Sequence, residues 1–473
     1  MPAAARDGTA QSGARRRLRA LRCHLGQEGA APELAAAASA PAPTPAAAER
    51  PLDAVIVGAG FAGLYAIRKL RDELGLNVVA LETGNGVGGT WFWNRYPGAR
   101  CDVHSVEYSF SWDDELQQEW DWEEVMAAQP QILEYADHVA DRFDLTRSIQ
   151  FETKVVGCAF NEATEQWAVT TDRGDTFSAQ FLIGCVGCLS TPNEPGGAND
   201  IPGVDDFEGP VYHTGRWPHD VSPEDLRGQR VGIIGTGSSG IQSIPVIAEH
   251  AEHLTVFQRT AQYSLPANNH DVDEDYREMI KGNYGPLREL AKKSPAGFIT
   301  GFGGRTSATD GTHMPEPQMY AIMDMTPEER LEALEREGFE LFRQLSDVGM
   351  SMEANAVACD LFATHLRDVV HDPDTAAKLT PSGQPFGCKR QVMDTDYYPT
   401  YNRPNVDLVD LRRGGIKTVT STGVSTEQGD TDLDVLVLAT GFDAMTGALL
   451  RMNIVGRDGE SLDSHWEAGN HRN

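Results

Sequence analysis

Short runs of apolar residues, each followed by a glycine-rich turn and a stretch of helical periodicity, recur along this chain. The first is DAVIV from Asp53, followed by the helical segment GLYAIRKLRDEL and a second apolar run, NVVALE. A second such unit begins near Gln229 with RVGIIG, and a third apolar run, DVLVLATGF, lies close to the C-terminal end. Strand, helix and strand in this order form the βαβ unit of a parallel sheet. The pattern therefore predicts an α/β protein with two such units.

The segment between about residues 270 and 380 has a different pattern. It is helical and highly charged, as in TPEERLEALEREGFELFRQLSDVG. Because it separates the second βαβ unit from the last apolar run, we expect an inserted helical region that covers a cleft rather than a separate domain.

The composition indicates a globular protein of two or three domains, since 473 residues exceed what one hydrophobic core usually supports. The formal net charge is −30, and the first 50 residues carry seven Arg against four acids, or +3, which leaves −33 for the rest. Such an acidic surface repels phosphate backbones, so nucleic acid is not an expected partner. No apolar run reaches the roughly 18 residues of a membrane helix, so no membrane segment is expected.

The seven cysteines are odd in number and scattered without the spacing of a disulfide framework. This favours a reducing compartment and thus a cytoplasmic protein. Cys185 and Cys188 form a CxxC at the end of the apolar run FLIGCVGC. No second Cys or His pair lies nearby to complete a metal site, so no metal is predicted. We expect two small buried residues at a strand end, with a redox or zinc role as the alternative.

Residues 1–50 contain 17 Ala together with Pro and Gly clusters, and too few large apolar side chains to offset the entropy of ordering them. We expect this segment to be a disordered tail. Within it, RRRLRALRCHL spaces Leu18, Leu21 and Leu25 at helical intervals among arginines. Since a mitochondrial-type targeting helix has the same pattern, import into a mitochondrion or another organelle is the alternative.

Gly58, Gly60 and Gly63 form a GxGxxG turn between the first apolar run and its helix. In that context the glycines permit a tight turn, a close approach of the backbone to a pyrophosphate and tight packing of helix on strand. The helix N-terminus faces the phosphates. Glu82 ends the second strand, 24 residues after Gly58, where a carboxylate can accept both ribose hydroxyls of FAD or NAD. The first unit is therefore predicted to bind a dinucleotide.

Gly235, Gly237 and Gly240 form a second turn of the same kind, GTGSSG. The strand after its helix ends in Gln258-Arg259-Thr260, so a cation and a hydroxyl replace the carboxylate of the first unit. An Arg fork with a hydroxyl suits the 2′-phosphate of NADP; the alternative for Arg259 is a solvated surface charge. Two dinucleotide sites, one suited to a 2′-hydroxyl and one to a 2′-phosphate, indicate a flavin that is reduced by NADPH.

Further motifs surround these turns. Gly88-Gly89-Thr90-Trp91, four residues, then Tyr96-Pro97-Gly98 and Asp102 match the longer pattern of the Baeyer-Villiger monooxygenases. Their shorter fingerprint, FxGxxxHxxxWP, is matched by Phe207, Gly209, His213, Trp217 and Pro218. Residues 388–406, CKRQVMDTDYYPTYNRPNV, and the turn Ala439-Thr440-Gly441 are similar to two more segments of that family. From about residue 52 to 468 the chain therefore resembles a type I Baeyer-Villiger monooxygenase.

This resemblance implies that FAD, NADPH and O2 are used to insert one oxygen atom next to a ketone carbonyl through an FAD C4a-peroxide, which yields an ester or lactone. Arg390 would be the catalytic arginine, held by Asp102, because a guanidinium supplies the fixed positive charge that the peroxide and the oxyanion need. Lys389 would be a second contact to the NADP phosphate, and His213 would join the domains without direct chemistry. Besides the glycines and Glu82, the implied cofactor-binding residues are Thr90, Trp91, Asp102, Tyr108, Val155, Thr236, Ser238, Ser239, Gln242, Arg259 and Thr260.

The expected fold is two dinucleotide-binding (Rossmann-like) domains with an inserted helical region. After the tail at 1–50, the FAD-binding domain has its first part at 51–191 and its return at 429–473. The NADP-binding domain has its parts at 192–269, with the linker fingerprint at 207–218, and at 381–428. The helical insertion occupies 270–380.

The chain departs from the family pattern in a few places. Family members usually continue well past the position of Trp466, whereas this chain ends in EAGNHRN. An incomplete gene model, or a truncated, weakly active or inactive flavin-binding remnant, is therefore one competing hypothesis. His104 stands where an acid is usual in the family, and His219 stands where an acid or Ala is usual. Two different enzymes compete with the main hypothesis as well: a flavin monooxygenase that hydroxylates N or S, and a disulfide reductase that uses Cys185 and Cys188.

Overall fold

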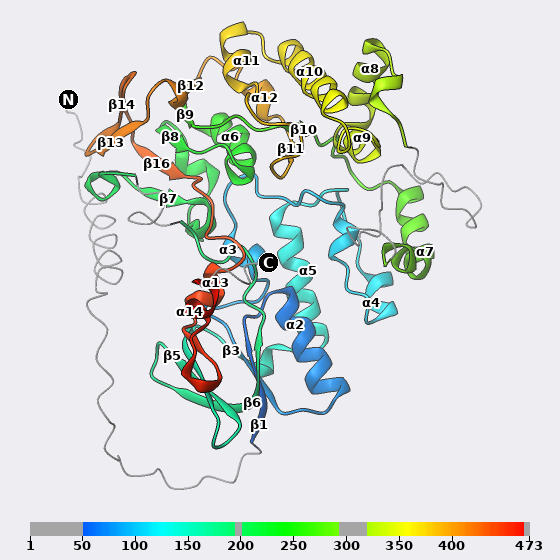
Figure 1. Cartoon of the computed structure of the whole chain (residues 1–473), viewed down its shortest axis with the longest axis vertical. Coiled ribbons are helices and arrows are strands. Elements are labelled where there is room, and N and C mark those ends of the chain that lie inside the picture. The colour runs from blue at the N-terminus through cyan, green and yellow to red at the C-terminus, as the bar shows by residue number, and fades with distance from the viewer. Residues whose placement is uncertain (1–50, 194–200, 293–318, 468–473) are drawn as a thin grey trace, which may run out of the picture. The chain divides into compact units, whose positions relative to one another are not determined.

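The structure is a computed structural model that describes residues 51–193, 201–292 and 319–467 (Figure 1). The predictions for the tail at 1–50, for part of the helical insertion and for the last six residues lie outside the described residues. The described part of the chain contains two larger sheets. Each includes the strand that leads into one of the two glycine turns.

The first sheet has seven strands in the order β17-β4-β5-β6-β1-β2-β3. Its centre is the predicted βαβ unit, in which β1 pairs in parallel with both β2 and β6. The predicted helix is found, but it continues after Ile67 as a π-helical segment, Arg68–Glu73. Because the strands are parallel, Gly58, Glu82 and Cys185 follow them at one edge of the sheet. The bounds are β1 Leu52–Val57, α2 Phe61–Ile67, β2 Val78–Leu81, β3 Ile149–Gln150, β4 Val155–Asn161, β5 Gln166–Thr171, β6 Thr176–Gly184 and β17 Ile454–Val455.

The second sheet has five strands, all parallel, in the order β12-β9-β8-β16-β7. Its central strands are short apolar runs that lie buried on both faces, as parallel strands covered by helices usually are. The carboxyl ends of β8, β9, β16 and β7 meet at one edge, where the second glycine turn, Arg259, Thr440 and His213 lie. The bounds are β7 Val211–His213, β8 Arg230–Ile234, α6 Ser238–His250, β9 His253–Gln258, β12 Val406–Asp410 and β16 Val435–Leu438.

The helices of the predicted insertion divide between two hydrophobic cores. Ile280, Tyr284 and Leu287 of α7 are buried with residues of the first unit, among them Ile132 and Tyr135. The later helices contribute to the core beneath α6 and β9 instead. The described helices of the insertion therefore do not share one core of their own. The bounds are α5 Gln129–Arg142, α7 Glu274–Ala291, α8 Pro327–Glu337, α9 Phe339–Gln344, α10 Met352–Val369 and α11 Pro373–Leu379.

Smaller elements connect these parts. The strands β10 and β11 form a parallel pair, and β13, β14 and β15 form an antiparallel sheet of three strands. Within the described ranges no helix is both long and apolar enough to cross a membrane. The bounds are α3 Thr90–Trp93, α4 Asp114–Glu119, β10 Ser264–Pro266, β11 Val392–Asp394, α12 Tyr397–Thr400, β13 Ile416–Thr420, β14 Gly423–Thr426, β15 Gly429–Asp432, α13 Gly447–Leu450 and α14 Leu462–Glu467.

The prediction for the CxxC segment is wrong in one respect. Cys185 is half-buried, but Cys188 is exposed. The reason is that β6 ends at Gly184 and that Gly187 adopts a left-handed φ of 71°, which turns the chain outward. Both are free cysteines, and no cluster of potential metal ligands occurs among the residues that could be described.

Candidate functional site

The three positions of the first turn require glycine for different structural reasons. Gly58 has a φ of 102°, and a Cβ there would lie 2.4 Å from the carbonyl oxygen of Cys185. A Cβ on Gly63 would lie 2.1 Å from the carbonyl oxygen of Gly58. Gly60 is different, since its Cβ would lie no closer than 3.3 Å to any heavy atom, the nearest being Gly89 Cα. The fold itself thus requires glycine at Gly58 and Gly63. At Gly60 a side chain would instead cover the free surface of the turn.

Glu82 lies where the sequence places the ribose contact. The residue is 6% exposed, and its carboxylate accepts hydrogen bonds from the backbone N–H of Ala59 at 2.7 Å and of Gly84 at 2.8 Å. Two carboxylate oxygens offer about four acceptor positions, so two remain for hydroxyl donors. Glu82 therefore joins the glycine turn to the end of β2 and fits the ribose of a dinucleotide.

The second turn repeats this arrangement. A Cβ on Gly235 would lie 2.4 Å from the carbonyl oxygen of Ala439, and one on Gly240 would lie 2.3 Å from that of Gly235. A Cβ on Gly237 would meet no heavy atom within 4 Å. Gly237 also precedes the first residue of α6, so free backbone N–H groups face this open space. The turn therefore leaves room for a phosphate against the helix N-terminus.

The side chains around the second turn are partly engaged. Thr236 donates its hydroxyl to the carbonyl oxygen of Thr260 at 3.0 Å, and the Ser239 and Thr214 hydroxyls are 2.9 Å apart. Ser238 is half-buried. Arg259 is exposed, and no carboxylate of the described residues forms an ion pair with it. A guanidinium that pairs with no carboxylate in the described ranges, placed just beyond β9, suits an external phosphate.

Arg390 and Asp102 lie together, although 288 positions separate them in the sequence. One guanidinium nitrogen, Nη2, donates to both carboxylate oxygens at 2.6 Å. The Asp102 side chain is 16% exposed and that of Arg390 is 64% exposed, so the carboxylate is fixed in the protein while the cation faces outward. Lys389, next to Arg390, is exposed as well. The Arg390–Asp102 contact that the resemblance implies is thus present, and its cation is exposed.

The residues of the longer motif pack beside this pair. Gly88-Gly89 have left-handed φ values of 104° and 56°, and Gly89 lies against Gly60. Trp91 is buried, and its ring meets that of Tyr108 edge to face at 5.4 Å. Burial, with Cys101 and Asp102 nearby, raises the pKa of Tyr108, so its hydroxyl stays protonated. Thr90 is exposed at the start of α3, and Val155 is buried at the start of β4.

His213 is hydrogen-bonded to groups at the carboxyl end of the second sheet. Its Nδ1 accepts a hydrogen bond from the Gly215 N–H at 2.9 Å, and its Nε2 lies 3.1 Å from the Thr440 hydroxyl, which donates to the carbonyl oxygen of Asn193. Burial and the nearby Arg216 lower the pKa of His213 to about 4. The neutral ring therefore carries its proton on Nε2 and donates it to Thr440. These contacts fit a structural role for His213; that it joins the domains stays a prediction.

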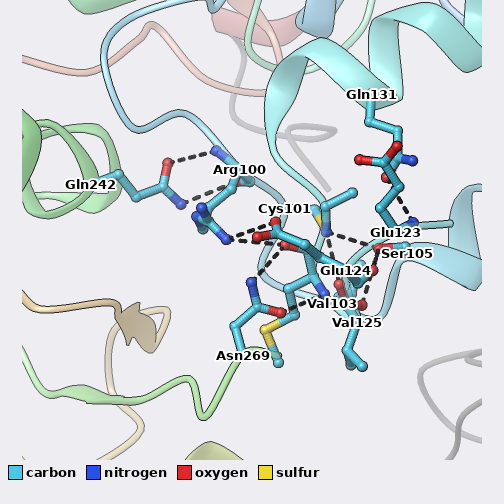
Figure 2. Close-up of polar contacts among 12 residues, drawn as sticks. Arg100, Cys101, Val103, Ser105, Glu123, Glu124, Val125, Gln131, Gln242 and Asn269 are labelled. Carbon is cyan, nitrogen blue, oxygen red and sulfur yellow. Dashed lines mark hydrogen bonds and ion pairs between the residues drawn. The ribbon is translucent and has the colours of Figure 1, made fainter. Parts of the chain in front are cut away.

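The side chain of Gln242 lies against Arg100 of the first unit (Figure 2). Its Oε1 accepts from the Tyr96 hydroxyl at 2.7 Å and from the Arg100 N–H at 3.5 Å, and its Nε2 donates to the Arg100 carbonyl oxygen at 3.1 Å. In the structure, the amide of Gln242, which is a predicted cofactor contact, is hydrogen-bonded to Tyr96 and Arg100. The motif showed only that a glutamine follows the turn; its partners come from a distant segment and leave no local signal.

His104 was noticed in the sequence only as a departure from the family pattern. Its Nδ1 lies 3.0 Å from the Tyr276 hydroxyl of α7, and its Nε2 lies 3.8 Å from Glu340 of α9. Burial, with Arg343 nearby, lowers the pKa of His104 to about 4. The segment that carries Asp102 is therefore hydrogen-bonded through His104 to α7 of the insertion, a contact that no sequence pattern indicated.

Comparison with known proteins agrees with this geometry. The family model described as flavin-binding monooxygenase-like matches residues 53–276. A phenazine N-monooxygenase of Lysobacter antibioticus is 42% identical over 422 residues, which are 88% of this chain and 74% of that protein. A Baeyer-Villiger monooxygenase of Pseudooceanicola batsensis is 42% identical over 424 residues, which are 88% of this chain and 73% of that protein.

A solved structure described as an oxidised steroid monooxygenase bound to NADP superposes with a TM-score of 0.79. It is 47% identical in sequence, and the match covers 89% of this chain and 77% of that one. The two glycine turns, the Arg390–Asp102 pair and this likeness over most of the chain agree with one another. This chain belongs to the Baeyer-Villiger monooxygenases, a family of flavin-binding monooxygenases.

Proposed function

We propose that this protein is an NADPH-dependent flavoprotein monooxygenase that inserts one oxygen atom from O2 next to the carbonyl of a ketone, giving an ester or lactone. The observation that carries the proposal is the Arg390–Asp102 pair in a chain that also has two dinucleotide turns. In this pair an exposed cation is bound to a carboxylate that is largely buried. Six free cysteines among the described residues support a reducing compartment, which fits the cytoplasm.

The two units have separate tasks in this proposal. Gly58, Gly60, Gly63 and Glu82 of the domain at 51–191 hold FAD, with Thr90, Trp91, Tyr108 and Val155 around it. Gly235, Gly237 and Gly240 of the domain at 192–269 hold NADPH. Arg259, Thr260 and Lys389 bind its 2′-phosphate. When bound, the two cofactors supply the reducing equivalents and the activation of oxygen.

The residues of the chain supply binding and electrostatics. Asp102 fixes the guanidinium of Arg390 through two short hydrogen bonds, so the cation does not reorganise when negative charge develops on the carbonyl oxygen of the ketone. A guanidinium stays protonated at every relevant pH, which a Lys in the same place would not guarantee. Arg390 thus stabilises charge, and Asp102 keeps it in place.

The direct test is product analysis on the purified protein. A flavin absorption spectrum, oxygen uptake that depends on both NADPH and ketone, and formation of an ester or lactone by chromatography are expected from a panel of cyclic and linear ketones. Absence of ester with any ketone, although the flavin is bound and NADPH reduces it, would contradict the proposal.

A second candidate is N-oxygenation, because the phenazine N-monooxygenase is as similar to this chain as the ketone-oxidising relative. The same assays with aromatic N-heterocycles in place of ketones distinguish the two. N-oxides without ester formation would support the second candidate.

We expect Arg259→Ala to weaken NADPH binding by about tenfold to a hundredfold, since it removes charge-assisted hydrogen bonds to a 2′-phosphate, and to leave NADH binding unchanged. Titration of both nucleotides against the holoenzyme measures this. Arg403→Ala is the matched control, because Arg403 is also exposed but precedes β12 at the opposite edge of the same parallel sheet. Equal affinity of the unmutated protein for NADPH and NADH would disprove the assignment of Arg259.

A further inference from the structure

Gln242 connects the second glycine turn with the segment that carries Asp102 (Figure 2). Both acceptor positions of its Oε1 are used, by the Tyr96 hydroxyl and the Arg100 N–H, and its Nε2 donates to the Arg100 carbonyl oxygen. Gly98 permits this close approach, since its φ is 79° and a Cβ would lie 2.1 Å from the Gln242 carbonyl oxygen. The side chain therefore holds the backbone of Arg100 at its N–H and its C=O.

Arg100 is also held from the other side. Its Nη1 donates to Glu124 at 3.2 Å and to the Met126 carbonyl oxygen at 3.2 Å. Asn269, which follows β10, binds the Met126 backbone at both its N–H, at 2.8 Å, and its C=O, at 3.2 Å. The turn before Asp102 is thus fixed by groups from both units (Figure 2).

Asp102 lies only two residues beyond Arg100, and two residues span at most about 7 Å of chain. A displacement of the Arg100 backbone therefore moves the Asp102 carboxylate by a similar amount. Both short hydrogen bonds to Arg390 depend on that carboxylate, and a misplacement of about 1 Å in an active site can cost a hundredfold in rate.

We propose that Gln242 is a positioning residue, which holds the Arg100 backbone so that Asp102 presents both carboxylate oxygens to Arg390. Because α6 begins at the second glycine turn, Gln242 also couples the unit proposed to bind NADPH to the charge pair. The inference rests on the function proposed above and assigns Gln242 a different role from the one that the family resemblance implies.

The experiment uses the FAD-loaded enzyme and compares Gln242→Leu with Tyr96→Phe. Gln242→Leu removes three hydrogen bonds at similar size, whereas Tyr96→Phe removes one hydroxyl and keeps the test open if the first variant does not fold. We expect the NADPH dissociation constant to stay within about twofold in both variants. The fraction of consumed NADPH that yields ester should fall by roughly tenfold in Gln242→Leu and by less in Tyr96→Phe. Gln428→Leu is the control, since Gln428 also donates its amide to a backbone carbonyl oxygen, that of Asp410, but lies far along the chain from Asp102.

A double-mutant cycle tests whether Gln242 acts through Asp102. In an Asp102→Asn background, Gln242→Leu should lower the residual ester yield by less than about twofold, since the pair it positions is already impaired. An equal loss in both backgrounds would overturn the proposal, and so would a tenfold weaker NADPH affinity with unchanged ester yield. An unmutated enzyme that forms no ester from any ketone would contradict the proposed function instead, so the two failures are distinguishable.

Discussion

Arg390→Ala is expected to lower ester formation by on the order of a hundredfold or more, while the protein still binds FAD and still reduces it with NADPH. The reason is that the guanidinium lies on Asp102 and faces outward, so it contributes charge to the reaction and little to the packing of the fold. The NADPH that is consumed should then appear as hydrogen peroxide. Product chromatography beside NADPH and peroxide assays measures both quantities.

Two further variants make this result specific. Arg390→Lys should recover little activity, because a flexible point charge does not reproduce the planar guanidinium, which Asp102 holds by one nitrogen, Nη2, while its other N–H donors stay available. Arg413→Ala is a matched control, since Arg413 is 69% exposed and lies 4.0 Å from the buried Asp410 in a different part of the second unit. Ketone oxygenation at an undiminished rate in Arg390→Ala would remove Arg390 from the mechanism.

The sequence predicted those features that depend on local conformation. A GxGxxG turn between a strand and a helix has few alternative geometries, so both turns and the parallel strands that lead into them were predictable. The position of the Glu82 carboxylate at the end of β2 was predictable for the same reason. The Arg390–Asp102 contact spans 288 positions, and only the family resemblance indicated it. No periodicity in the sequence reports which residues meet across such a distance.

Most of the features that were not predicted depend on tertiary contacts. Helical periodicity shows which face of α7 is buried but not against what, and the helix packs on the first unit while α10 packs on the second. The partners of Gln242 and His104 come from distant segments, so the sequence could show the residues but not their contacts. The exposure of Cys188 depends on the left-handed conformation of Gly187. The apolar run before Gly187 gives no indication of this conformation.

The second large effect is expected from a substitution in the first turn, Gly60→Val, which should abolish retention of FAD while the protein still folds. Gly58 and Gly63 are unsuitable for this test, because a Cβ there would overlap backbone atoms at 2.4 Å and 2.1 Å and disturb the fold directly. The Cβ of a residue at 60 would lie 3.3 Å from Gly89 Cα, a contact that a small shift relieves, while its methyl groups cover the surface against which a pyrophosphate would lie. The measurement is the flavin absorbance per chain after purification, with circular dichroism to show that the secondary structure is intact.

The second turn supplies the reciprocal test. Gly237→Val should lose NADPH affinity and keep FAD, since a Cβ at 237 meets no heavy atom of the protein within 4 Å and extends only into the space beside the start of α6. Gly349→Val is the control for both variants. Gly349 is exposed, a Cβ there would also meet nothing within 4 Å, and the residue lies far from both turns in the sequence. The two dinucleotides are assigned to the correct units if each variant loses one cofactor and keeps the other. Normal FAD occupancy in Gly60→Val together with loss of FAD in Gly237→Val would reverse the assignment, and normal binding of both cofactors in both variants would show that neither turn contacts a phosphate.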